Sequence, residues 1–220
     1  MDGRSVMRCW GWIALGLICA AAAPGRGSCQ ALLNEIMADP ATDWDGDGSY
    51  DFRGDEWIEI VNVGIDPLDL TQLYLGDESG GFVYGFEGTL ASGEVRVVYG
   101  SQAVPWEQAN GEAATGLRLG NDGDTATLWQ VANGDTLLVD AYSYNTQEAE
   151  DDRSTGRNPD GSSVWEIFDA LNPYAGQGPP SGNGLAPTPG ARNDGEGSTP
   201  VASSTWGRVK RLFTADGVAG

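Results

Sequence analysis

The chain contains no histidine and only three cysteines, and both shortages restrict its chemistry. Cys9, Cys19 and Cys29 all lie within the first 31 residues, which we expect to be removed on export. The remaining chain then has neither a thiol nor an imidazole. This inventory excludes zinc sites of the cysteine and histidine type, thiol nucleophiles, disulfides and any Ser/His or Cys/His dyad.

Basic residues are scarce as well. The chain has 12 lysines and arginines against 32 aspartates and glutamates, which gives a formal net charge of −20 at pH 7. A chain this negative repels nucleic acid phosphates and anionic lipid head groups, so we expect no nucleic acid partner. Long helical periodicity is also missing, whereas 33 glycines and frequent turn pairs favour an all-β domain.

The first 31 residues have the pattern of a signal peptide. Two arginines precede an apolar run at residues 10–23, which is too short to span a membrane comfortably. Cys29 and Ala31 provide small residues at the −3 and −1 positions, so we predict cleavage after Ala31, with a site near Ala23 as the alternative. Lipidation at Cys29 is disfavoured because Arg26, three positions earlier, is not apolar. The pattern predicts a secreted or extracellular protein, or one held at a bacterial cell envelope.

Residues 43–64 contain the most informative motif, an acidic loop that runs into an alternating segment. Asp43, Asp45 and Asp47 stand at alternate positions and Gly48 follows, which is close to the calcium loop D-x-[DN]-x-[DN]-G. Calcium takes about six to eight oxygen ligands, and it offsets the repulsion between crowded carboxylates. The predicted calcium ligands are Asp43, Asp45, Asp47, Ser49, Asp51, Asp55 and Glu56.

This loop departs from an EF-hand at its twelfth position, which is Gly54 instead of a bidentate glutamate. Asp55 and Glu56 follow one and two residues later, so either acid can close the loop with altered geometry. The flanking segments have an extended pattern and not a helical one, which favours a calcium loop between β-strands. The alternative is an ordinary solvated acidic surface loop without a metal.

Short alternating segments recur along the chain at roughly ten-residue spacing, with turn residues between them. They lie at residues 32–37, 56–63, 68–70, 73–75, 82–86, 94–99, 125–131 and 136–144. The last two flank Asn133 and Gly134, the dipeptide of a type I′ hairpin turn. This pattern predicts an all-β sandwich. We expect residues 105–116 to be irregular and to cover one end of the sheet.

The alternation fades from residue 148 onward. Arg153 and Arg157 are the cations of this very acidic neighbourhood. We expect them to pair with carboxylates and to hold an ordered loop on the edge of the sandwich. A role in binding a ligand is the alternative.

The C-terminal residues change in composition. Residues 194–204 are polar and rich in Gly, Ser and Pro, and they predict a flexible linker. Residues 205–220 contain the single lysine and predict an amphipathic tail, with Trp206, Val209 and Phe213 on one helical stripe. This tail is a frayed end, a helix that docks on the acidic sandwich, or a sorting element that a partner at the cell envelope recognises.

The order of several motifs along the chain resembles that of a lamin tail domain of the bacterial secreted type. The motifs are NEI at residues 34–36, DEWIEIVN at 55–62, residues 70–75, 90–93 and 117–124, RNPDG at 157–161 and PTPGARN at 187–193. The resemblance covers residues 32–193. It implies an immunoglobulin-like β-sandwich that serves as a binding or tethering module and carries no catalytic residues. Acidic insertions before the DEWIE strand are similar to a variation within this family.

The leading functional hypothesis is therefore an exported, non-catalytic sandwich, stabilised by Ca²⁺, that binds an extracellular protein or glycan. One alternative is a structural component of the cell surface or matrix without a specific ligand. Another is a glycosidase that uses two carboxyl groups, for which Glu35, Glu56 and Glu59 are the candidates on or near strands.

Overall fold

The computed structural model describes residues 30–76 and 81–193, and the account below concerns these residues. The predicted linker and amphipathic tail, residues 194–220, lie outside the described part, and so does almost all of the predicted leader. Ala31, the last residue of that leader, is already paired with Asn62 in the first strand. Cleavage near Ala23 therefore leaves this strand intact, whereas cleavage after Ala31 shortens it.

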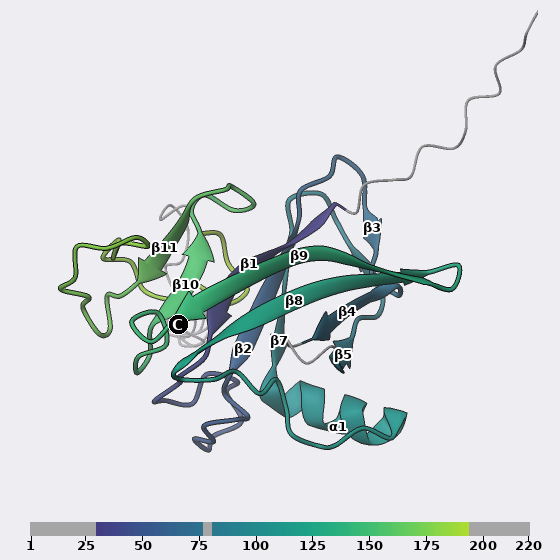
Figure 1. Cartoon of the computed structure of the whole chain (residues 1–220), viewed down its shortest axis with the longest axis horizontal. Helices are drawn as coiled ribbons and strands as arrows, with labels where there is room; N and C mark the ends of the chain where they lie inside the picture. Colours follow the sequence, from purple (N-terminus) through teal and green to yellow (C-terminus); the bar gives the residue numbers. More distant parts are fainter. Residues whose placement is uncertain (1–29, 77–80, 194–220) are drawn as a thin grey trace, which may run out of the picture.

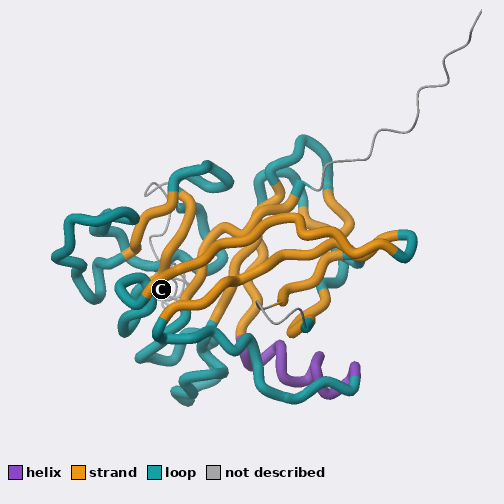
Figure 2. The backbone as a smooth tube through the Cα atoms, in the orientation of Figure 1, coloured by secondary structure: helices purple, strands orange, loops and turns teal. Residues whose placement is uncertain are grey.

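Strands are the main regular structure of the described chain, and they are joined by long loops and one helix (Figures 1 and 2). The elements in chain order are β1 (Ala31–Met37), β2 (Trp57–Asn62), β3 (Leu68–Asp69), β4 (Leu73–Gly76), β5 (Phe82–Gly85), β6 (Thr89–Leu90), β7 (Val95–Tyr99), α1 (Gly100–Asn110), β8 (Gly123–Ala132), β9 (Asp135–Asn145), β10 (Ser154–Arg157) and β11 (Trp165–Phe168). Among the described residues, no helix has the length and apolar character needed to cross a membrane.

Two antiparallel sheets form a sandwich. The first has the strand order β11-β10-β1-β2-β7 and the second has the order β5-β4-β8-β9, while β3 and β6 form a small separate pair. The long hairpin of β8 and β9 lies across β1 and β2 in Figure 1. Leu33 and Ile60 from the first sheet and Leu75 and Leu128 from the second belong to one buried core cluster. The prediction of an all-β, immunoglobulin-like sandwich is confirmed.

Strand β2 is buried on both of its faces. Ile58 and Ile60 face the core between the sheets, as their alternation predicts. Glu59 lies on the other face and is also fully buried. A later segment of the chain covers this face, because the backbone N–H of Gly190 donates to Glu59 Oε2 at 2.8 Å. The acidic loop at residues 43–56 is therefore attached to a strand of the first sheet that is buried along its whole length.

The prediction that residues 105–116 are irregular is wrong for their first part, because α1 extends to Asn110. Its sequence includes Pro105 and has almost no apolar stripe, so local propensity gave no helical signal. Contacts outside the helix stabilise it instead. The carboxylate of Glu107 is buried and accepts the backbone N–H groups of Thr115 at 2.7 Å and Gly116 at 2.8 Å. Gly111 ends the helix at a φ of 77°.

The region that was predicted to be a loop after residue 148 contains two further strands. The antiparallel partners of β10 are β1 and β11, so this segment belongs inside the first sheet. The four residues of β10 are mostly polar yet all buried, so the pattern of alternating hydrophobic residues does not predict this strand. Gly156 is needed there, since a Cβ at this position would lie about 3 Å from atoms of Glu35, Asn193 and Phe168.

These late strands should be required for folding. A chain that ends after Asn145 lacks β10 and β11 and exposes one edge of β1, which is buried over most of its length. We expect this truncated protein to aggregate or to lose cooperative thermal unfolding, as measured by circular dichroism. A chain that ends after Asn193 is the control and should melt cooperatively. Equal melting curves for the two truncations would contradict this expectation.

Candidate metal centre and the buried carboxylates

The acidic loop between β1 and β2 folds around one buried carboxylate, that of Asp55. Asp55 Oδ1 accepts the backbone N–H groups of Trp44 at 2.7 Å and Asp45 at 3.0 Å. Asp55 Oδ2 accepts the N–H of Asp51 at 2.8 Å. Asp55 immediately precedes Glu56 and β2, so the rigid sheet fixes its position. The carboxylate thereby draws both halves of the loop toward the start of the strand.

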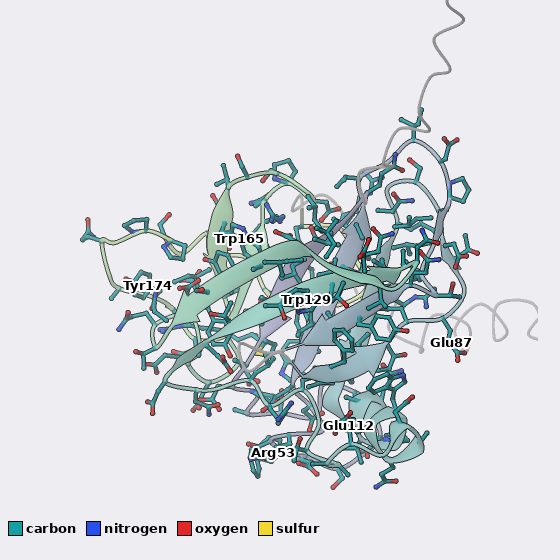
Figure 3. All side chains as sticks on the ribbon, turned by 45° about the vertical axis from the view of Figure 1, so that its right-hand side comes forward. Arg53, Glu87, Glu112, Trp129, Trp165 and Tyr174 are labelled. Carbon is teal, nitrogen blue, oxygen red and sulfur yellow. The ribbon has the colours of Figure 1, made fainter. Side chains whose placement is uncertain are left out.

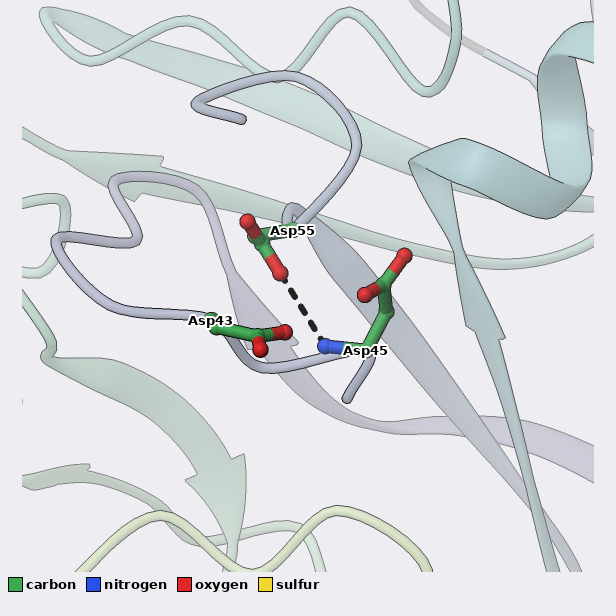
Figure 4. A group of neighbouring side chains, drawn as sticks. All are labelled: Asp43, Asp45 and Asp55. Carbon is green, nitrogen blue, oxygen red and sulfur yellow. Dashed lines mark hydrogen bonds between the residues drawn. The ribbon is translucent and has the colours of Figure 1, made fainter. Parts of the chain in front are cut away.

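Three of the predicted calcium ligands come together at this point. One carboxylate oxygen each from Asp43, Asp45 and Asp55 lies within 4.8 Å of the other two (Figure 4). Asp43 is exposed, Asp45 is half-buried and Asp55 is buried, so the group opens from the protein toward solvent. Oxygens that share one calcium ion at about 2.3 to 2.6 Å can be no more than about 5 Å apart, and these three carboxylates meet that condition.

Three other predicted ligands lie beside this group. Asp47 Oδ1 accepts the N–H of Ser49 at 2.7 Å, and Asp51 Oδ1 accepts the N–H of Arg53 at 3.0 Å. One cavity of about 400 Å³ is lined by five of the predicted ligands, namely Asp45, Asp47, Ser49, Asp51 and Asp55. Asp47, Ser49 and Asp51 are thus close to the three carboxylates without being part of their cluster.

Glu56 lies in a different environment from the other predicted ligands. Its carboxyl group is buried, and its Oε2 accepts the backbone N–H of Leu119 at 3.2 Å. Burial raises the pKa of Glu56 to about 8. Glu56 thus bonds to the segment before β8, whereas Asp55 faces the loop. The structure therefore supports closure of the loop by Asp55.

A second acidic segment, at residues 148–152, anchors this loop. In the sequence it marks only the point at which the alternating pattern fades. Asp152 Oδ1 accepts the N–H of Ala41 at 2.8 Å and the indole N–H of Trp44 at 2.7 Å. Burial and the charges of Asp151, Glu150 and Asp152 raise the pKa of Asp39. The acidic run is visible in the sequence, but only the fold shows that it contacts the acidic loop between β1 and β2.

Two of the three glycosidase candidates, Glu35 and Glu59, are fully buried in the first sheet. Burial raises the pKa of Glu35 to about 7 and that of Glu59 to about 9, and for Glu59 the neighbouring charge of Glu35 adds to the effect. Glu35 accepts hydrogen bonds from the N–H of Thr188 at 3.1 Å and from its hydroxyl at 2.6 Å. Glu59 accepts from Asn34 Nδ2 at 2.8 Å. These carboxyl groups bind other parts of the chain and have no contact with solvent.

The PTPGARN motif is the segment that these acids hold in place. Asn193 Nδ2 donates to the carbonyl of Arg157 at 3.0 Å, and the N–H of Asn193 donates to Asp160 at 2.9 Å. Thr188 and Gly190 complete the attachment through Glu35 and Glu59. The motif is therefore a closing segment over the outer face of the first sheet.

The expectation for the two arginines is confirmed for one of them. Arg157 forms an ion pair with Asp140 at 2.9 Å and lies over the ring of Trp165 at 4.8 Å. Arg153 was predicted to pair with a carboxylate, but it donates to backbone carbonyls, including that of Asn172 at 2.6 Å. Several carbonyls converge there because the loop before β10 and the chain after β11 meet at that edge.

The two-sheet sandwich, with buried carboxyl groups in its first sheet and an acidic loop before β2, defines an immunoglobulin-like β-sandwich domain. A family model described as Lamin Tail Domain matches residues 27–146. The chain therefore belongs to the lamin tail domain family, which is not typically catalytic. No curated protein and no solved structure that was compared with the chain matches it. The described sandwich continues beyond the family match, through β10, β11 and the closing segment.

The raised pKa values predict how stability depends on pH. Glu35 and Glu59 bind protons more tightly in the folded chain than at their ordinary pKa of 4.5, so their stabilising contribution is complete below pH 4.5. We expect the free energy of unfolding to fall as pH rises from 5 to 9. The slope should reach about 1.4 kcal/mol per pH unit for each carboxyl that is protonated only when folded.

The measurement is thermal or urea unfolding at a series of pH values. Glu59→Gln removes one of these titrations and should flatten the dependence, even though the amide loses a hydrogen bond and lowers stability at pH 5. Glu112→Gln, at an exposed position, is the matched control and should follow the wild type. A wild-type protein whose stability is constant from pH 5 to 9 would refute the assignment.

Proposed function

We propose that this protein is an exported, non-catalytic lamin tail domain that binds or tethers an extracellular protein or glycan, and that a calcium ion stabilises it. The observation that carries the calcium part is the convergence of Asp43, Asp45 and Asp55. Membership of a family that is not typically catalytic supports the binding role. The signal-peptide pattern at residues 1–31 supports export to the extracellular space or the cell envelope.

The donor set fits calcium in its chemistry. All three groups are carboxylates, which suit a hard cation, and none of the described residues is a histidine. Both oxygens of Asp43 and both oxygens of Asp55 accept backbone N–H groups, which orient these carboxylates within the loop. Asp47 and Asp51 on the adjoining cavity, together with water, can complete the coordination.

The burial of the candidate acids disfavours the glycosidase alternative. Glu35 and Glu59 are enclosed under the closing segment, and Glu56 is almost fully buried. A general acid and its partner have to flank a bound substrate. Burial of these acids does not argue against the other alternative, a structural component without a specific ligand. The binding assay below distinguishes that alternative from the proposed binding module.

Calcium should raise the melting temperature. A ligand that binds only the folded state at 100 times its dissociation constant adds about 2.7 kcal/mol, which corresponds to about 5 to 10 °C for a domain of this size. We expect this rise between chelator and millimolar Ca²⁺, measured by differential scanning calorimetry. Asp43→Asn should abolish it and should lower the stability of the apo protein only slightly, because Asp43 is exposed and the amide loses one of the two hydrogen bonds from Gly46 and Gly48.

Asp122→Asn is the matched control, since Asp122 is an exposed acid in a turn before β8. This variant should keep the full calcium response. An equal rise in the Asp43→Asn protein would place the ion elsewhere, and no rise in the wild type would exclude the calcium proposal.

The binding role is tested with arrays of glycans and extracellular proteins, probed with the full chain in the presence of calcium. A specific signal is the expected result, and its absence favours the structural component. Fractionation of cells that express the full chain should place it outside the cytoplasm. Deletion of residues 206–220 should release the protein from the cell envelope if the tail is a sorting element, whereas an unchanged distribution would exclude that role.

A further inference from the structure

A cavity of about 430 Å³ lies between α1 and the β4-β5 pair, away from the acidic loop. Figure 1 shows α1 beside β5 at this end of the second sheet. Six lining residues matter here, namely Thr71, Tyr74, Gly85, Glu87, Trp106 and Asn110. The volume falls in the range of about 300 to 1,000 Å³ that is typical of small-ligand sites.

Two partly exposed aromatic side chains form the walls of this cavity. The ring centroids of Tyr74 and Trp106 are 6.3 Å apart at an interplanar angle of 66°. Tyr74 also stacks on Phe82 at 4.7 Å, which fixes its ring against β5. Gly85 lies between the walls, and a Cβ there would come within 2.9 Å of both rings. The walls are thus held by a strand and a helix, and not by mobile loops.

The polar rim presents several hydrogen-bond acceptors. The hydroxyl of Thr71 hydrogen-bonds the carboxylate of Asp69, which leaves the Thr71 oxygen as an acceptor. Asn110 Nδ2 donates one of its two N–H groups to the carbonyl of Trp106 at 2.8 Å, so its Oδ1 and its second N–H remain for a ligand. Glu87, labelled in Figure 3, is an exposed carboxylate on the loop after β5. A ligand that suits this rim has many donors and no negative charge.

We propose that this cavity binds a neutral polysaccharide through one or two of its pyranose rings. This inference rests on the proposed binding function and names its site. The C–H face of a pyranose ring packs on an aromatic wall, because the face of the aromatic ring is negative and the C–H groups are weakly positive. The sugar hydroxyls donate to Thr71, Glu87 and Asn110. Glu87 and the net charge of −20 repel acidic glycans.

The main competing ligand for an aromatic groove is a proline-rich peptide. Such a peptide offers many carbonyl acceptors and few donors, because proline has no backbone N–H. It therefore leaves the acceptors of Thr71, Glu87 and Asn110 without a donor. The observed rim favours a polyhydroxylated ligand over this peptide.

The experiment is affinity electrophoresis of the full chain in gels that contain hydroxyethyl cellulose, xyloglucan, mixed-linkage β-glucan or galactomannan. Polygalacturonate serves as the anionic comparison. We expect at least one neutral polysaccharide to retard the protein and polygalacturonate not to do so. Trp106→Ala should weaken the apparent affinity at least tenfold, and Asn110→Ala, which alters an exposed side chain, should weaken it measurably without affecting folding.

The matched controls are Tyr174→Ala and Glu112→Gln, at positions that do not line the cavity and are labelled in Figure 3. Both should bind like the wild type. Retardation that survives in Trp106→Ala and Asn110→Ala would overturn the site and leave the binding function standing. Binding to a proline-rich peptide or an arrayed protein, with no neutral polysaccharide bound, would also overturn this inference alone. Failure to bind in every assay would overturn the proposed function as well.

Discussion

The buried carboxyl groups of Glu35 and Glu59 are the interaction on which the rest of the first sheet depends. They stand on adjacent central strands and receive hydrogen bonds from Thr188, Asn34 and Gly190. Each acid leaves solvent only because these donors replace water. Burial favours the protonated form of both acids, and the hydrogen bonds oppose this effect only in part. A segment more than 120 residues away in sequence is thereby fixed over the sheet, so the domain is complete only when residue 193 is included.

The position of β2 also determines the geometry of the candidate metal centre. Asp55 is the last residue before Glu56 and the strand, and its carboxylate gathers the backbone of the acidic loop. Asp152, from the loop before β10, accepts the indole N–H of Trp44 and holds the loop from the other side. The three clustered carboxylates therefore depend on the first sheet for their spacing, although two of them lie near the surface.

Helix α1 connects the candidate metal centre with the aromatic cavity. At its start, the N–H of Gly100 donates to the carbonyl of Glu56, and the N–H of Ser101 donates to that of Gly54. Near its end, Trp106 and Asn110 contribute to the cavity. An ion that orders the acidic loop would consequently stabilise the helix that positions one wall of the proposed glycan site. The calcium proposal and the glycan proposal thus concern two separate sites that α1 connects.

The sequence alone determined the features that depend on neighbours along the chain. Alternation identified β2, Asn133 and Gly134 marked the β8-β9 hairpin, and the spaced aspartates pointed to the acidic loop. Tertiary structure alone decided the features that depend on distant partners. Strand β10 is polar and is buried only because Glu35 and the closing segment satisfy it, and α1 forms through contacts such as Glu107 with Gly116. Local patterns report hydrophobic periodicity and turn preference, whereas a buried polar group is stabilised by donors and acceptors that the fold brings from elsewhere.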